Sequence, residues 1–291
     1  MSLPAPDVHG LLRRYGLRPD KRLGQNFLID PAALSQVVEA AKITANDIVL
    51  EIGPGLGSLT HLLAAQARKV IAVELDANLI SPLQEVISGL PNVQVVQGDM
   101  LNLNPSELLA ESIIDSAPST PGYLVVANIP YYITSPLMRH LLEADFQPRR
   151  LVLTVQREVA LRICAAPGDL SLLALSVQVY GLPHIEAYIP SAAFFPSPQV
   201  DSAVVRVDIY TSPLIPTDLL PGFFRLVRAG FSQKRKNLRN SLSAGMHWTP
   251  AETVTLLEAA GIAPSLRAEK LSMDEWKTLV EKTRQLHLTI K

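Results

Sequence analysis

The stretch Asn128-Ile129-Pro130-Tyr131 follows an apolar, strand-like run at 123–127. An exocyclic amine of a nucleobase is a poor nucleophile because its lone pair is delocalised into the ring, and it becomes reactive when the site accepts both N–H protons. The Asn128 amide oxygen can accept one proton, and a backbone carbonyl held by the rigid Pro130 can accept the other. Tyr131 offers a ring on which an extruded base can stack. This spacing predicts methyl transfer to a base nitrogen, with a simple strand-end turn as the alternative.

A glycine-rich turn at 53–57, of the pattern Gly-x-Gly-x-Gly, lies between a strand-like run and a helical pattern. Glycines let a backbone turn tightly and approach a ligand closely. Glu74 ends the next strand-like run, where an acid can accept from both hydroxyls of a ribose. We prefer it to Asp76 because the run ends at Glu74. Asp99 ends a third run and can accept from an adenine amino group, so the three strand ends predict a nucleoside pocket.

Strand-like runs and amphipathic segments alternate through most of the chain. The expected strands are 48–52, 70–75, 93–97, 124–127, 151–155, 184–189 and 203–209, and helical patterns lie at 31–42, 59–67, 77–90, 105–112, 135–144, 157–165 and 171–180. Apolar runs of this kind are typical of parallel strands covered on both faces. We therefore expect an α/β, Rossmann-like fold with a seven-stranded, mostly parallel sheet and helices on both faces.

The pattern becomes wholly helical after the linker-like stretch 211–216. Helices are expected at about 217–230, 234–244, 250–260 and 273–287. We place a boundary near residue 212. Residues 1–212 are expected to form the catalytic, cofactor-binding domain, which begins with a basic arm of about 22 residues that includes a short helix. Residues 213–291 are expected to form a small all-helical domain.

Composition excludes several classes of protein. The 291 residues are 48 % hydrophobic and 18 % charged, which supports a sizeable core. A single cysteine, Cys164, excludes a disulfide framework and a cysteine-based metal site, and the six histidines show no ligand spacing. The first residues lack an apolar signal core, and no run of about 18 apolar residues occurs. We expect a monomeric cytoplasmic protein with no metal and no membrane association.

Basic residues are concentrated in two places, although the net charge is −1. The stretch 219–251 contains no acidic residue and six basic ones, and a second basic stretch covers 13–22. Such patches on a near-neutral chain indicate a surface for a polyanion, with solvated helix faces as the alternative.

Together these motifs resemble those of class I S-adenosylmethionine-dependent methyltransferases. More closely, they resemble the ribosomal RNA adenine dimethyltransferase family, which makes N6,N6-dimethyladenine in small-subunit (16S) rRNA. The similarity covers nearly the whole chain. It implies S-adenosyl-L-methionine as cofactor, two adjacent adenines of small-subunit rRNA as substrate, and the immature small ribosomal subunit as partner during ribosome biogenesis.

The resemblance assigns roles along the chain. The segment 21–28 resembles the family's N-terminal signature, and the expected cofactor contacts are Asn26, Leu28, Gly53, Gly55, Glu74, Leu75, Asp99, Met100 and Asn128. The expected catalytic residues are Asn128, Pro130, Tyr131 and Phe194. Phe194 belongs to a Phe-x-Pro-x-Pro-x-Val-x-Ser loop and would stack on the target adenine opposite Tyr131.

Two further segments support the resemblance, and one departs from it. Residues 231–242 resemble the family's rRNA-contacting helix, with Lys234, Arg235, Lys236 and Arg239 as the expected RNA contacts. Residues 267–272 resemble another signature. The family often has Tyr-Gly-x-Leu-Ser in the loop after the helix that follows the fifth strand, whereas here 166–171 reads Ala-Pro-Gly-Asp-Leu-Ser.

Several alternatives share part of this pattern. A 23S rRNA adenine methyltransferase of the macrolide-resistance type has the same site chemistry, but the segments 232–242 and 267–272 favour the small subunit. A non-catalytic ribosome assembly factor is disfavoured by the intact Gly53, Glu74, Asp99 and Asn128, whereas an assembly role alongside catalysis stays open. A DNA adenine methyltransferase would need a sequence-reading domain, which is not indicated. The glycine spacing and the segment 128–131 disfavour a NAD-dependent dehydrogenase.

Overall fold

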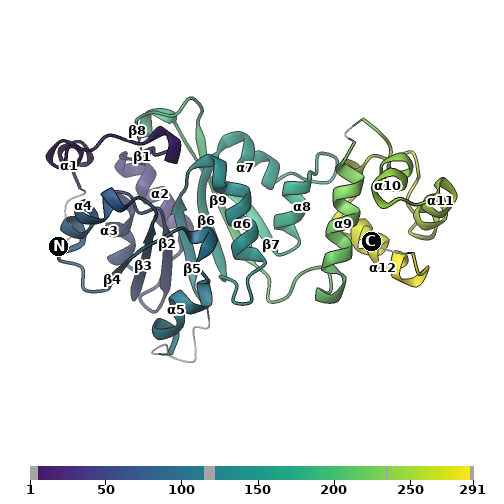
Figure 1. Ribbon diagram of the computed structural model, residues 1–291, viewed down its shortest axis with the longest axis horizontal. Coiled ribbons are helices and arrows are strands. Elements are labelled where there is room, and N and C mark those ends of the chain that lie inside the picture. Colours follow the sequence, from purple (N-terminus) through teal and green to yellow (C-terminus); the bar gives the residue numbers. More distant parts are fainter. Residues whose placement is uncertain (1–5, 115–121, 234, 289–291) are drawn as a thin grey trace. The chain divides into compact units, whose positions relative to one another are not determined.

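The computed structural model describes residues 6–114, 122–233 and 235–288 (Figure 1). The chain divides into two compact units, one of Met1–Ala160 with Pro183–Ile209 and one of Leu161–Leu182 with Tyr210–Lys291. The expected boundary near residue 212 lies close to the start of the second stretch of unit 2 at Tyr210. The segment Leu161–Leu182, which also belongs to unit 2, was not expected there. The functional division into 1–212 and 213–291 stays a prediction.

The first unit is built on the predicted seven-stranded, mostly parallel sheet, which is confirmed. Its strands are β2 (Ile48–Ile52), β3 (Lys69–Glu74), β4 (Val93–Gln97), β5 (Leu124–Asn128), β6 (Arg150–Gln156), β7 (Gly181–Ile189) and β9 (Ser202–Ile209). They lie in the order β4-β3-β2-β5-β6-β9-β7. Strands β2 to β6 pair in parallel, and β9 pairs antiparallel with β6. The carboxyl ends of β2 to β5 therefore meet at one edge.

Helices cover both faces of this sheet (Figure 1). They are α2 (Pro31–Ala41), α3 (Ser58–Ala64), α4 (Ala77–Ile87), α5 (Pro105–Ile114), α6 (Thr134–Leu142) and α7 (Arg157–Ile163). Every residue of the central strand β2 is buried, as expected for a strand covered on both sides. Helix α2 begins where expected, because the Asp30 carboxylate accepts from the Ala33 amide at 2.8 Å and Pro31 occupies its first turn.

The N-terminal segment contains a short helix, as expected, and this helix packs within the first unit. Helix α1 (Val8–Arg14) buries Val8, Leu11 and Leu12 in a cluster with Phe27, Leu56 and Leu79. Two of the basic side chains are paired, Arg14 with Glu85 and Arg22 with Asp20. The apolar face of α1 was missed because only three apolar side chains define it.

A two-stranded antiparallel sheet joins two segments that are far apart in the sequence. Strand β1 (Phe27–Leu28) pairs with β8 (Phe194–Phe195), with Leu28 opposite Phe194. Two residues are too few to give a periodic signal, so these strands were not predicted. The pairing brings the N-terminal signature beside the proline-rich loop.

The second unit is helical among its described residues, as expected. It contains α8 (Leu172–Gln178), α9 (Leu220–Phe231), α10 (Leu238–Met246), α11 (Pro250–Ala259) and α12 (Met273–Gln285). The helix expected at 234–244 begins only at Leu238, because the extended Asn237 caps it by accepting from the Asn240 amide at 3.1 Å. Arg235 and Lys236 therefore precede the helix, and Lys234 lies outside the described residues.

The loop that departs from the family pattern is anchored by the signature 267–272. The Gly168 amide donates to the Glu269 carbonyl at 3.1 Å, and the Lys270 ammonium donates to the Gly168 carbonyl at 2.9 Å. Gly168 has a φ of 115°, a conformation that glycine adopts readily. The loop thus has a defined place within the second unit without the Tyr-Gly pair.

Candidate active site

A cavity of about 240 Å³ opens at the carboxyl edge of the sheet. Parallel sheets of this kind bind ligands at that edge. The cavity brings together all of the predicted cofactor and catalytic residues, namely Asn26, Leu28, Gly53, Gly55, Glu74, Leu75, Asp99, Met100, Asn128, Pro130, Tyr131 and Phe194. Their roles stay predictions, but their shared location is a property of the structure.

The glycine-rich turn after β2 needs glycine at each of its three positions. Gly53, Gly55 and Gly57 have φ values of 70°, 59° and 83°. Residues other than glycine rarely adopt these φ values. A Cβ atom on Gly55 would also lie 3.0 Å from the Phe27 ring. Gly53 and Gly55 line the cavity, and neither has a side chain that would fill it.

Glu74 fixes that turn to the end of β3. Its carboxylate accepts from the Gly55 amide at 2.9 Å and from the Asp76 amide at 2.8 Å. Glu74 is 5 % exposed. Burial raises the pKa of Glu74, while the two amides oppose that rise. Each oxygen keeps a further lone pair, so the group can accept from ribose hydroxyls.

Asp76 has other partners. Its carboxylate accepts from the Asn78 amide at 3.0 Å and caps α4. Asp99 begins a short 3₁₀ turn, Met100–Asn102, and accepts from the Leu101 amide at 3.0 Å. With apolar walls beside two acids and a glycine cradle, the cavity fits an adenosine-containing cofactor such as S-adenosylmethionine.

Asn128 ends β5 with its amide in a defined orientation. Its Nδ2 donates to the Asn26 carbonyl at 3.0 Å. A carbonyl oxygen can only accept, so the nitrogen must face Asn26 and Oδ1 is left as the acceptor. Pro130 follows, with φ −56° and ψ 134°, and leads into the 3₁₀ turn Tyr131–Ile133. An acceptor side chain and a restrained backbone thus meet at the cavity, as predicted.

The two predicted stacking residues both line the cavity, but neither is freely exposed. The Tyr131 hydroxyl lies 2.7 Å from Ser202 Oγ, and burial raises the pKa of Tyr131. Phe194 is 2 % exposed and packs in the core with Leu28. A base would reach its ring only inside the cavity.

Tyr132 and Gln25 are among the cavity residues to which sequence reasoning assigned no role. Tyr132 lines it and is 60 % exposed, and the signal was the aromatic pair Tyr131-Tyr132. Gln25 lines it too, but its partner Asp76 is far away in the sequence and no pattern connects them.

The expected RNA contacts belong to the second unit. Arg235, Lys236 and Arg239 are exposed and form no ion pair among the described residues. The described parts of the chain contain no group of three or more His, Cys, Asp or Glu side chains that could bind a metal ion. Within the same residues, no helix combines the length and apolar character needed to cross a membrane.

The sheet order and the cavity define a class I S-adenosylmethionine-dependent methyltransferase. The family model described as ribosomal RNA adenine dimethylase matches residues 17–285, and the chain belongs to this family. It is 43 % identical to the ribosomal RNA small subunit methyltransferase A of Dehalococcoides mccartyi strain CBDB1, over 92 % of this chain and 90 % of that protein. The protein of the same name from Moorella thermoacetica is 41 % identical, over 92 % and 94 %.

Two solved structures are similar along most of the chain. A dimethyladenosine transferase from Plasmodium falciparum has a TM-score of 0.77 and 26 % identity, covering 91 % of this chain and all of that one. The 23S rRNA methyltransferase ErmE has a TM-score of 0.69 and 28 % identity, covering 89 % of this chain and all of that one. The predicted family, fold class, enzyme class and cofactor are confirmed.

A buried acid lies beneath the glycine-rich turn. Glu51, on β2, is 1 % exposed. Burial raises the pKa of Glu51 to about 8, and the charge of Glu74 adds to the rise while Thr60 opposes it. The carboxyl is therefore mostly protonated in the folded protein at pH 7.

We predict that Glu51→Gln changes the pH dependence of stability. Between about pH 4.5 and pH 8 the unfolded chain has lost the Glu51 proton while the folded protein retains it, so rising pH destabilises the wild type. The glutamine of the variant does not titrate in this range. The melting temperature of the variant should therefore rise relative to that of the wild type as the pH increases from about 4.5 to about 8. Thermal unfolding at a series of pH values tests this, and a pH-independent difference would contradict it.

Proposed function

We propose that this enzyme transfers methyl groups from S-adenosylmethionine to N6 of two adjacent adenines in small-subunit rRNA. The observation that carries the proposal is the fixed Asn128 amide, whose oxygen is left as an acceptor in the cavity that also contains Glu74 and the glycine-rich turn. The relatives that are 41–43 % identical over more than nine-tenths of this chain are named ribosomal RNA small subunit methyltransferase A, which supports the small subunit as target.

Positioning and desolvation are the main tasks of the protein in this mechanism. When bound, S-adenosylmethionine supplies a methyl group activated by a positively charged sulfur. The Asn128 oxygen and a backbone carbonyl beside Pro130 would accept the two N6 protons and so direct the nitrogen lone pair. Tyr131 and Phe194 would stack on the base, at about 1–3 kcal/mol each. A general base is not required, because the proton on the methylated nitrogen is acidic.

The second unit would supply sequence-independent contacts to rRNA. Arg235 and Lys236, in the turn before α10, and Arg239, in its first turn, are exposed cations in a stretch without acidic residues. Exposed cations of this kind neutralise phosphates. We further propose that the protein acts as a monomer in the cytoplasm, without metal, on immature small subunits.

The direct test is transfer of labelled methyl groups to unmethylated small subunits, with large subunits assayed in parallel. We expect N6,N6-dimethyladenine in the small-subunit rRNA alone, because the relatives with 41–43 % identity are named as small-subunit rRNA methyltransferases. Label in large subunits would assign the chain to the 23S enzymes. Binding to small subunits without label would indicate an assembly factor.

Asn128→Ala should lower kcat by about 100-fold or more, because it removes an acceptor that aligns the reacting nitrogen. The dissociation constant for S-adenosylmethionine should change by less than about tenfold, since Glu74, Asp99 and the glycine-rich turn remain. Single-turnover kinetics and calorimetric binding measure the two quantities. An equal loss of both would contradict the separation of catalytic and cofactor roles.

Replacing Arg235 and Lys236 together with Ala should weaken binding to small-subunit rRNA and reduce its salt dependence. Each lost phosphate contact should lower the slope of log K against log[salt] by about 1. Titrations at several salt concentrations measure the slope, and affinity for S-adenosylmethionine is the control. An unchanged slope would refute the assignment of these residues as phosphate contacts.

A further inference from the structure

The segment 20–28, which we call the strap, forms one wall of the cavity. Leu23 to Leu28 all line it. Gly24 has the left-handed conformation and lies close to the segment 128–133, which we call the catalytic loop. A Cβ atom on Gly24 would lie 3.1 Å from Pro130 Cβ and 3.4 Å from the Tyr132 ring, so glycine allows this close approach. At its C-terminal end the strap pairs with β8.

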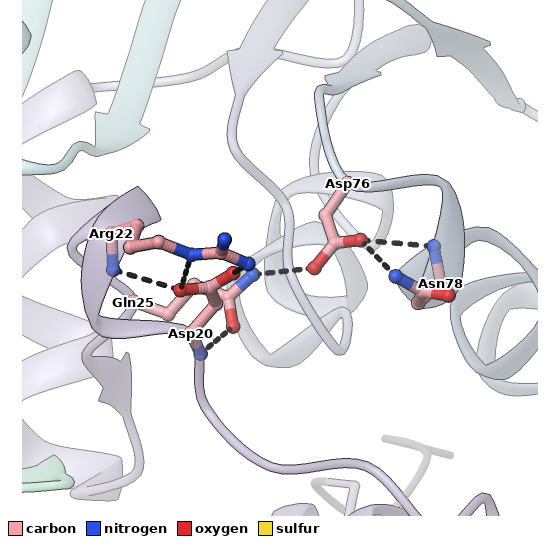
Figure 2. Close-up of polar contacts among 5 residues, drawn as sticks. All are labelled: Asp20, Arg22, Gln25, Asp76 and Asn78. Carbon is pink, nitrogen blue, oxygen red and sulfur yellow. Dashed lines mark hydrogen bonds and ion pairs between the residues drawn. The ribbon is translucent and has the colours of Figure 1, made fainter.

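Gln25 connects the strap to the end of β3 (Figure 2). Its Nε2 donates to Asp76 Oδ2 at 2.7 Å, and its Oε1 accepts from the Asp20 amide at 2.8 Å. The carboxylate can only accept and the amide N–H can only donate, so this position needs one donor and one acceptor on the same side chain. A glutamine meets that requirement, whereas a glutamate would place an acceptor against the Asp76 carboxylate.

The remaining bonds of Asp76 make it a firm support for Gln25. Its Oδ1 accepts from the Asn78 amide at 3.0 Å and from Asn78 Nδ2 at 2.9 Å (Figure 2). Its own amide donates to Glu74 Oε1 at 2.8 Å. The strap is thereby linked, through one residue, to the acid that is expected to bind the ribose.

One residue further along, the strap contacts the catalytic loop. Asn26 Nδ2 donates to the Gly24 carbonyl at 3.0 Å, which stiffens the turn, and the Asn26 carbonyl accepts from Asn128 Nδ2. This carbonyl determines which way the Asn128 amide faces. A shift of Gln25 would displace the neighbouring Asn26 carbonyl as well.

We propose that Gln25 is a positioning residue that fastens the strap over the methyl-donor cavity through Asp76 and thereby keeps the Asn26 carbonyl where it orients the Asn128 amide. The bond to Asp76 retains the cofactor, and the position of Asn26 aligns the acceptor for the base. The inference rests on the proposed function for its effect on turnover, while its effect on cofactor binding is independent of rRNA.

A pair of reciprocal substitutions tests this proposal. Gln25→Glu places two carboxylates together. Asp76→Asn turns an amide nitrogen toward Gln25 Nε2, because the amide and Nδ2 of Asn78 both donate on the Oδ1 side and hold the remaining oxygen there. Each change should therefore weaken S-adenosylmethionine binding by about tenfold to 100-fold and lower kcat. In the double variant Q25E/D76N, the introduced asparagine can donate to the introduced glutamate, which still accepts from the Asp20 amide. Its dissociation constant and kcat should return to within about threefold of the wild type, far from the product of the single effects.

The readouts separate a positioning role from a general loss of structure. Calorimetric binding of S-adenosylmethionine without rRNA, kcat on small subunits, and the melting temperature are measured for every variant. Asn78→Ala is the matched control, since it removes only one of the two bonds to Asp76 Oδ1. The Asn78 backbone amide still donates to that oxygen and the Gln25 bond stays in place, so the cofactor affinity should stay within about threefold of the wild type.

Three results would overturn the proposal. They are unchanged cofactor affinity in both single variants, a double variant no better than the two single effects combined, and changes confined to the melting temperature. A failure of every variant and of the wild type to methylate small subunits, with the affinity pattern intact, would count against the proposed substrate and leave the role of Gln25 in cofactor binding supported.

Discussion

The buried carboxylate of Glu74 is the interaction on which the site depends. It accepts from the amides of Gly55 and Asp76, and so joins the glycine-rich turn after β2 to the start of the helix after β3. A buried carboxylate is tolerated only when such donors surround it. The turn has three glycines in the left-handed region and needs an external partner to keep one shape. The same group that would bind the cofactor therefore also shapes the loop that receives it.

Local signals predicted the sheet well. The runs at 48–52 and 93–97 match β2 and β4 to the residue. Strand β2 is buried at every position, as expected for a central strand covered on both faces, whereas β4 lies at the edge of the sheet and none of its residues is fully buried. The clustering of Gly53, Glu74 and Asn128 also followed from the sequence, since parallel strands deliver their ends to one edge.

What the sequence did not reveal depends on contacts between distant residues. The pairing of β1 with β8 and the bond from Gln25 to Asp76 leave no periodic trace, because each involves one or two side chains. The start of α10 was placed too early since the basic residues before Asn237 have good helix propensity, and the side-chain cap overrode it. The insertion of Leu161–Leu182 into the second unit is likewise a three-dimensional fact, because linker composition marks only boundaries that are contiguous in sequence.

The packing of α1 changes how a shortened protein should be understood. Leu56, in the glycine-rich turn, shares a cluster with Val8, Leu11 and Leu12 of that helix. Deleting the first 16 residues would therefore remove apolar contacts that support the glycine-rich turn, where the nucleoside is expected to bind. Loss of methylation of ribosomal particles by such a truncated protein would then reflect weaker binding of the methyl donor and not weaker binding of RNA. Equilibrium dialysis with the methyl donor alone distinguishes the two defects.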